Sequence, residues 1–271
     1  MIPAKFAYRR AATVDEALAL LAEHGDDAKL IAGGHSLLPL MKLRFAAPEV
    51  VVDIAPLTEL KFVRLDGDEV VIGALSRYHD LQRDPVLAQH APLLAHAAGT
   101  VGDPQVRHRG TIGGSLAHAD AAADLPAVVL ATGGTLVARG PSGERRIPAR
   151  EFFLGPFTTP LEPDELLTEI RLPSRAGLGW AFEKFTRRAI DWAIVGVAVT
   201  GHAVGLINMG GTPLRATATE RALAAGTPAA EAALLAAEDT APPDEPHATP
   251  DYRRHLARVL TARALARAEA S

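Results

Sequence analysis

The sequence contains no cysteine among its 271 residues. This absence excludes a disulfide, a thiolate nucleophile and a cysteine-ligated iron–sulfur cluster on this chain. Hydrophobic residues, in contrast, make up 48% of the chain. That is enough to form the core of one large domain or of two smaller ones.

Long apolar segments and an excess of positive charge are also absent. No apolar run approaches the roughly 20 residues that a membrane-spanning helix needs. The formal net charge is −4 and the pI is about 6.2, so nothing argues for nucleic-acid binding. Residues 1–6 lack the charged start and apolar core of a secretory signal. We therefore expect a cytoplasmic protein with no membrane span and no nucleic-acid partner.

The most informative stretch is residues 29–40, Lys-Leu-Ile-Ala-Gly-Gly-His-Ser-Leu-Leu-Pro-Leu. An apolar run typical of a strand ends at Gly33-Gly34, and Ser36 then opens a segment with helical spacing. Paired glycines allow a closer approach to the backbone than a Cβ would permit. A strand, a glycine turn and a helix start together present free N–H groups to an anion. We therefore hypothesise that this loop holds the phosphates of a nucleotide cofactor.

Local patterns predict further elements in the first part of the chain. A capping box at 13–16 begins a helix. Strands at 29–32 and 50–54 flank the glycine turn, and their β-α-β order predicts a small parallel sheet. Further strands are expected at residues 60–65, 69–73, 134–138, 144–147 and 166–172. The stretch 99–123 has no apolar period, so we predict an irregular functional segment there.

A domain boundary is expected around residues 174–177. Beyond it, strands at 181–186, 194–200 and 203–208 predict a short antiparallel sheet. Helices are expected at 221–225 and 229–237, and a last helix begins with Pro250 at its first position.

A second glycine pair, Gly113-Gly114, lies 80 positions after the first. One pair alone says little, because glycine pairs are common in turns. Two pairs, each closely followed by Ser-Leu, favour a site in which backbone amides from two loops converge on a pyrophosphate. The spacing matches neither the G-x-G-x-x-G dinucleotide fingerprint nor the P-loop.

Residues 32–39 and 111–115, the latter followed by Asp124, resemble the two flavin-contacting segments of a known family. This family is the FAD-binding medium subunit of the molybdenum hydroxylases, which include carbon monoxide dehydrogenase and xanthine dehydrogenase. Later segments are similar to those of the family in the same order: residues 183–188, 191–193, 212–217 and 252–256. The resemblance covers essentially the whole chain.

The resemblance implies an α+β fold with FAD as the cofactor. Residues 1–173 would form a two-part FAD-binding domain, with a small β-α-β sheet and a larger mixed sheet on either side of the FAD. Residues 177–271 would form a C-terminal domain, with a short antiparallel sheet and helices, that closes over the flavin. The residues expected to line the pyrophosphate are Ile31, Ala32, Gly33, Gly34, His35, Ser36, Leu37, Thr111, Ile112, Gly113, Gly114 and Ser115.

Four more positions match cofactor contacts of the family, and each also has a purely structural interpretation. Asp124 would hydrogen-bond the cofactor, or it is only a helix N-cap. Leu167 would contact the flavin, or it is ordinary core. Lys184 would lie near the cofactor, or on an exposed face. Trp192, where many relatives have Tyr or Phe, would lie close to the isoalloxazine, or it packs in a core or an interface.

We expect no metal site and no catalytic side chain. The ten histidines show no H-E-x-x-H or Cys/His spacing. His35 and His118 are better explained as hydrogen-bonding residues that shape the loops. A Ser-His-Asp hydrolase is disfavoured, because neither glycine motif supplies G-x-S-x-G. In a flavoprotein the flavin does the redox chemistry, while the protein binds and orients it.

By this resemblance, the chain is an electron-transfer subunit of an oxidoreductase complex. A large partner subunit would oxidise the substrate at molybdenum, and a small one would carry two [2Fe–2S] clusters. Electrons would reach this chain's FAD and leave to an external acceptor: NAD, a quinone or oxygen. Two alternatives stay open. One is a stand-alone flavin oxidase or reductase, disfavoured by the short second domain, and the other is a nucleotide-binding scaffold without redox function.

Overall fold

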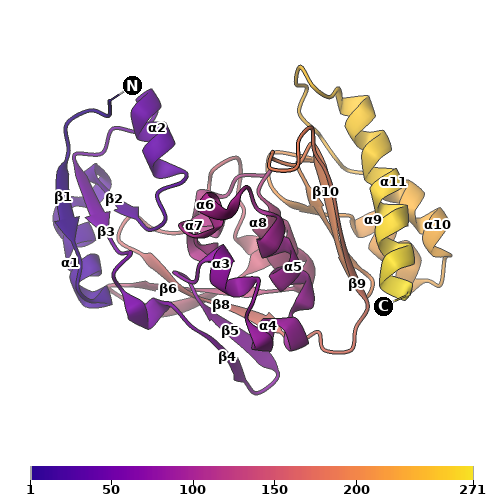
Figure 1. Cartoon of the computed structure of the whole chain (residues 1–271), viewed down its shortest axis with the longest axis horizontal. Coiled ribbons are helices and arrows are strands. Elements are labelled where there is room, and N and C mark those ends of the chain that lie inside the picture. The colour runs from indigo at the N-terminus through magenta and orange to yellow at the C-terminus, as the bar shows by residue number, and fades with distance from the viewer. Residues whose placement is uncertain (1, 271) are drawn as a thin grey trace.

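Three β-sheets follow one another along the long axis of the molecule (Figure 1). The structure is a computed structural model that describes residues 2–270. The strands are β1 (Ala7–Arg10), β2 (Ala28–Ile31), β3 (Val50–Asp53), β4 (Val63–Asp66), β5 (Glu69–Gly73), β6 (Thr135–Gly140), β7 (Gly143–Pro148), β8 (Leu166–Pro173), β9 (Trp180–Phe185), β10 (Val195–Thr200), β11 (Ala203–Ile207) and β12 (Leu214–Arg215).

Helices fill the spaces between and beside the sheets. The α-helices are α1 (Val14–His24), α2 (Leu37–Leu43), α3 (Tyr78–Leu81), α4 (Pro85–His90), α5 (Pro92–Thr100), α6 (Pro104–Arg107), α7 (Ile112–His118), α8 (Asp124–Thr132), α9 (Thr217–Ala224), α10 (Ala229–Ala232) and α11 (Pro250–Glu269). Single 3₁₀ turns lie at Gly25–Asp27, Thr58–Leu60, Ala149–Glu151 and Ala233–Leu235. None of the helices within residues 2–270 combines the length and apolar character needed to cross a bilayer.

The first sheet is parallel, with the order β1-β3-β2, as the β-α-β pattern predicts. Strand β1 was not predicted, because its sequence Ala-Tyr-Arg-Arg is short and polar and most of it is exposed at a sheet edge. Helix α1 begins with the predicted capping box. The Thr13 hydroxyl accepts the N–H of Glu16 at 3.1 Å, and the Glu16 carboxylate accepts the N–H of Ala12 at 2.7 Å.

The second sheet has the order β4-β5-β8-β6-β7 and is antiparallel throughout. The predicted α+β fold is confirmed, but the prediction of a mixed larger sheet was wrong. The two hairpins β4–β5 and β6–β7 pair antiparallel across their tight turns, and β8 runs antiparallel to both hairpins between them. Strand β8 separates β5 from β6, so no two neighbouring strands of this sheet are parallel.

The segment predicted to be irregular, residues 99–123, contains two short helices. Asp103 caps α6 by accepting the N–H of Val106 at 2.9 Å, with Pro104 at the first helical position. Thr111 caps α7 by accepting the N–H of Gly114 at 3.2 Å. Caps and a leading proline start helices that have no apolar repeat of their own, which is why the apolar pattern missed them.

The third sheet, β12-β11-β10-β9, is antiparallel as predicted and packs through α8 onto the rest of the molecule. Every residue of α8 is buried, because the helix contacts both the second and the third sheets. Helix α11 covers β9 and β10, and Figure 1 shows it on the side of the third sheet away from α8. Helix α8 therefore fixes the C-terminal sheet against the second sheet, and Asp124 at its first position lies at that junction.

Replacing Thr13 by alanine should lower the free energy of unfolding by about 1 kcal/mol, because one N-terminal N–H of α1 loses its acceptor. Thr13→Ser keeps the hydroxyl and should stay close to wild type. Urea unfolding monitored by circular dichroism measures both variants. Equal stability of all three proteins would contradict a stabilising role for this cap.

Candidate functional site

The first glycine pair is required by the geometry of the chain itself. Gly34 has φ +81°, a conformation that side chains with a Cβ rarely adopt. A Cβ on Gly33 would lie 2.3 Å from the carbonyl oxygen of Arg109, two residues before the second glycine segment begins at Thr111. The two glycine segments therefore pack directly against each other, although they are far apart in the sequence.

The backbone of the first loop offers unused hydrogen-bond donors. The N–H groups of residues 33–36 have no hydrogen-bond partner within the part of the chain that the structure describes. These residues lie between the end of β2 and the start of α2, and they line a cavity of about 450 Å³. Successive free N–H groups at a helix start form a concave site for an anion.

The second glycine segment differs from the prediction, because the N–H groups of residues 112–115 are already bonded within the chain. The bonds run from Ile112 to the Ser76 carbonyl (3.1 Å), from Gly113 to the Ala74 carbonyl (2.8 Å), from Gly114 to the Thr111 hydroxyl (3.2 Å) and from Ser115 to the Thr111 carbonyl (3.1 Å). The prediction that both loops present free amides was therefore wrong for this segment. This segment instead contributes polar side chains and the shape of the cavity wall.

The two glycines of this segment have different roles. Gly113 is buried, and a Cβ there would lie 2.6 Å from the Cβ of Ala74. Gly114 is exposed, and a Cβ there would meet only the Thr111 hydroxyl oxygen, at 2.8 Å. Gly113 therefore serves the packing of α7, whereas Gly114 leaves open space on the wall of the cavity.

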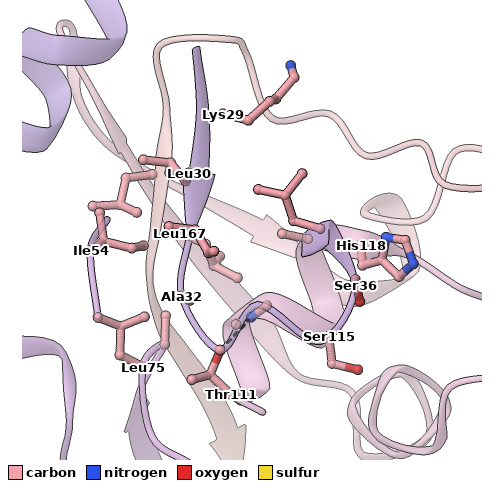
Figure 2. A pocket seen from close by; sticks show the side chains of 18 of the residues that line it. Lys29, Leu30, Ala32, Ser36, Ile54, Leu75, Thr111, Ser115, His118 and Leu167 are labelled. Atoms are coloured by element: carbon pink, nitrogen blue, oxygen red, sulfur yellow. Dashed lines mark hydrogen bonds between the residues drawn. The ribbon is translucent and has the colours of Figure 1, made fainter. Parts of the chain in front are cut away.

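A second cavity of about 250 Å³ adjoins the first. Five residues line both: His35, Ser36, Tyr78, Ser115 and His118. In Figure 2, Leu30, Ile54, Leu75 and Leu167 gather on one side of the first cavity, and Ser36, Ser115 and His118 lie on the other. The result is one continuous cleft with an apolar end and a polar middle.

The cleft brings together all but one of the residues that the resemblance implies. The first loop, Thr111, Gly113, Gly114, Ser115 and Leu167 line the first cavity, and Asp124, Lys184 and Trp192 line the second. Ile112 is the exception, since it is fully buried in the core and lines neither cavity. Leu167 belongs both to the core and to the cavity wall.

The structure excludes one alternative interpretation for each of three residues. Asp124 is the first residue of α8 and the N-cap is Ala123, so Asp124 is not a cap. Lys184 is not on an exposed face, because only 11% of its side chain is accessible. Trp192 is not a core residue, because 61% of it is exposed.

Asp124 and Lys184 form a buried ion pair in the second cavity, with 2.6 Å between Oδ2 and Nζ. Lys184 also donates to the carbonyl of Thr100 at 3.3 Å. The other carboxylate oxygen of Asp124, Oδ1, is buried without a hydrogen-bond partner. Burial raises the pKa of Asp124 to about 6, although the positive charge of Lys184 acts in the opposite direction. An unsatisfied buried acceptor beside a cavity points to a ligand that supplies a donor.

Sequence reasoning missed Tyr78 and Lys29. Tyr78 lines both cavities from α3, and burial raises its pKa to about 12, opposed by a hydrogen bond with Ser115. No local pattern marks Tyr78, which reaches the cleft only through tertiary packing. Lys29 lines the first cavity, and its place two residues before Ile31 on the same strand could have indicated it.

His35 and His118 line the cleft but do not shape it as predicted. Neither imidazole makes a hydrogen bond to another residue of the described range 2–270. The ring of His118 instead packs against Phe157, with 5.1 Å between the ring centroids.

The cleft fits the dinucleotide cofactor that the resemblance implies. It offers free amides for a diphosphate, an apolar end and an open surface at Gly114. The unpartnered Oδ1 of Asp124 offers an acceptor to a ring or ribityl donor. Cofactor sites of this kind are typically concave and mostly apolar, with a few placed polar groups.

Comparison with known proteins gives matches along the whole chain. The family described as the FAD binding domain in molybdopterin dehydrogenase matches residues 4–175, and the CO dehydrogenase flavoprotein C-terminal domain matches residues 180–268. The medium chain of carbon monoxide dehydrogenase from Hydrogenophaga pseudoflava is 44% identical over 98% of this chain and 97% of its own.

Two further matches agree with these. Subunit alpha of the 6-hydroxypseudooxynicotine dehydrogenase complex from Paenarthrobacter nicotinovorans is 40% identical over 99% of this chain and 96% of its own. The solved structure of the Hydrogenophaga pseudoflava carbon monoxide dehydrogenase superposes with a TM-score of 0.95. The match, at 45% identity, covers 100% of this chain and 99% of the other.

The raised pKa of Asp124 predicts a specific pH dependence of stability. The folded carboxyl keeps its proton up to about pH 6, whereas the unfolded one, with its ordinary pKa of 3.8, loses it earlier. Between these values the unfolded chain binds fewer protons, so the free energy of unfolding falls as the pH rises. The difference in pKa corresponds to about 3 kcal/mol.

The Asp124→Asn variant has no titratable group at this position, so its free energy of unfolding should not fall in this way as the pH rises. Urea unfolding of the cofactor-free wild type and of the variant at pH 4, 5, 6 and 7 gives the stability difference between them. We expect this difference to change by about 2.4 kcal/mol against the wild type on going from pH 4 to pH 7, because the rest of the loss falls outside this range. A difference that is constant with pH would contradict the burial argument.

Proposed function

Because the chain belongs to the family of FAD-binding medium subunits of molybdenum hydroxylases, we propose that it transfers electrons between an iron–sulfur partner and an external acceptor. FAD is the cofactor of this oxidoreductase family. When bound, FAD would supply the redox chemistry for this electron transfer. The chain's own residues bind and orient the cofactor and limit the access of water.

We assign the diphosphate of FAD to the first glycine loop, residues 31–37. The free N–H groups of residues 33–36 are the observation that carries this proposal. The second segment, Thr111 to Ser115, forms the facing wall, with Gly114 giving room for close approach. A diphosphate carries negative charge, and these amides are placed to satisfy it without a bound metal.

The flavin is assigned to the second part of the cleft. Asp124 and Lys184 lie there as a buried pair, and Trp192 presents an indole at the mouth. The unpartnered Oδ1 of Asp124 would accept a hydrogen bond from the cofactor. Leu167 lines the first cavity and not the second, so its apolar contact would be with another part of the cofactor.

The partners are those that membership of this family implies, and the composition of the chain is consistent with them. It has no cysteine, so the two [2Fe–2S] clusters would lie on a small partner subunit. The molybdenum centre that oxidises the substrate would lie on a large partner subunit, and the complex would be cytoplasmic. Within this chain, residues 1–173 would hold most of the FAD and residues 177–271 would close over it. The matched ranges 4–175 and 180–268 support this division.

The absorbance spectrum of the purified chain tests the proposal. A yellow preparation with a flavin band, or a colourless one that takes up FAD stoichiometrically, is expected. A folded chain that cannot be reconstituted with FAD would overturn the proposal. Purification from the native host should bring down two further subunits, one of them with iron and acid-labile sulfide. A lone chain that reduces its flavin with a small organic substrate would instead indicate a stand-alone oxidase.

Gly114→Val should weaken FAD binding by at least about tenfold, which corresponds to about 1.4 kcal/mol. The added side chain occupies open space on the cleft wall, and its Cβ would meet only the Thr111 hydroxyl in the chain itself. The fold should survive, since valine is no worse than glycine in a helix. Equilibrium titration with FAD, followed by flavin fluorescence, measures the change.

Ala88→Val is the matched control, because Ala88 is an exposed helical residue on α4 and lines neither cavity. It should bind FAD like the wild type. If a folded Gly114→Val variant binds FAD with wild-type affinity, Gly114 does not contribute to the FAD site.

A further inference from the structure

The loop between β9 and β10, residues 186–194, carries Trp192 to the second cavity. Trp192 is 61% exposed, so packing of the indole itself does little to fix its position. Inside the loop, one described backbone bond, from Asp191 to the carbonyl of Arg188 at 3.0 Å, forms a turn. The placement of Trp192 therefore depends on how the end of the loop is anchored.

Asn208 anchors the residue next to Trp192. It directly follows β11, and its side-chain amide Nδ2 donates to the carbonyl of Ala193 at 2.9 Å. The backbone N–H of Asn208 donates to the carbonyl of Ala121 at 2.8 Å. Ala121 precedes Asp124 by three residues, so Asn208 ties together the segments that carry Asp124 and Trp192.

The backbone of Asn208 indicates that its side chain is needed. Its φ is +60°, in the left-handed region that glycine adopts most easily and asparagine tolerates better than most residues. Glycine would satisfy the backbone but could not donate to Ala193. An unfavourable conformation persists where the surrounding contacts impose it, and here two hydrogen bonds do so.

Each of the other contacts near Asn208 fixes only one side of the second cavity. The guanidinium of Arg253 donates to the carbonyl of Ile194 and pairs with Glu245, which fixes the far end of the loop to α11. The segment around Ala121 is otherwise held by a local turn, in which Asp120 accepts the N–H of Ala122 at 2.9 Å. The start and end of the loop are also held, since the Arg187 guanidinium contacts the ring of His247 and the N–H of Ile194 donates to the carbonyl of Phe185 at 2.8 Å. Across the cavity, the Asp124–Lys184 pair joins β9 to α8, but none of these contacts links the Trp192 end of the loop to the Ala121 segment.

We propose that Asn208 is a positioning residue for the flavin end of the cleft. By donating to Ala193 while bonded to Ala121, it sets the distance between the Asp124 wall and Trp192 and so holds the indole over the cofactor. This inference rests on the proposed function, in which the second cavity holds the flavin. Asn208 itself lines neither cavity.

The test uses the full chain with Trp180→Phe, so that Trp192 is the single indole of the two in the sequence. Asn208→Gly keeps the left-handed backbone and the bond to Ala121 but loses the donor. Asn208→Asp keeps the shape of the side chain, but its carboxylate cannot donate to Ala193. Both should bind FAD about fivefold more weakly, as expected for one lost hydrogen bond. Both should also show less quenching of Trp192 fluorescence by bound FAD.

Thr219→Val is the control, because Thr219 makes a comparable buried side-chain bond, to the carbonyl of Ala232 at 3.0 Å, away from the cleft. It should lower the Tm but leave FAD affinity and Trp192 quenching unchanged. If the Asn208 variants behave like this control, Asn208 is merely structural and the inference is overturned.

Hydrogen exchange of the FAD-free chain tests the tether without the cofactor. The N–H of Asp191, bonded within the loop, should exchange several-fold faster in Asn208→Gly than in wild type or Thr219→Val. Equal rates in all three would overturn the inference. Failure of the parent chain to bind FAD, with the exchange difference intact, would instead count against the proposed function alone.

Discussion

The buried pair of Asp124 and Lys184 is the interaction on which the cofactor end of the structure depends. It joins the first residue of α8 to β9 of the C-terminal sheet, so it lies where the two halves of the chain meet. Burying two charges is expensive, and such a pair is weak evidence for stability on its own. The raised pKa of Asp124 and its unpartnered Oδ1 show that the pair leaves the carboxylate only partly satisfied. A cofactor that donates a hydrogen bond to this oxygen would satisfy the carboxylate.

A second constraint comes from how the backbone donors are distributed over the two glycine segments. In the first loop the N–H groups of residues 33–36 are free, whereas in the second the corresponding groups bond to the chain itself. The second segment is thereby rigid, and the first loop packs on it through Gly33. One segment thus supplies the support and the other supplies the anion site, although both have the same Gly-Gly pattern.

Local rules predicted the parts of the fold that local chemistry determines. The capping box at Thr13 and the strand before Gly33 depend on neighbours in sequence, and both are found as predicted. The pairing of Asp124 with Lys184, 60 residues apart, and the approach of Tyr78 to the cleft are set by packing of the whole chain. The burial of Ile112 shows the same limit, since matching a family motif does not say which of its residues face the ligand.

Residue-resolved hydrogen exchange with and without FAD shows directly whether the first glycine loop holds the diphosphate. The account predicts strong protection of the N–H groups of residues 33–36 on FAD binding, because these donors are free in the chain alone. It predicts little change at residues 112–115, whose N–H groups are already bonded. Bound FAD without protection at 33–36, or with protection confined to 112–115, would contradict the account.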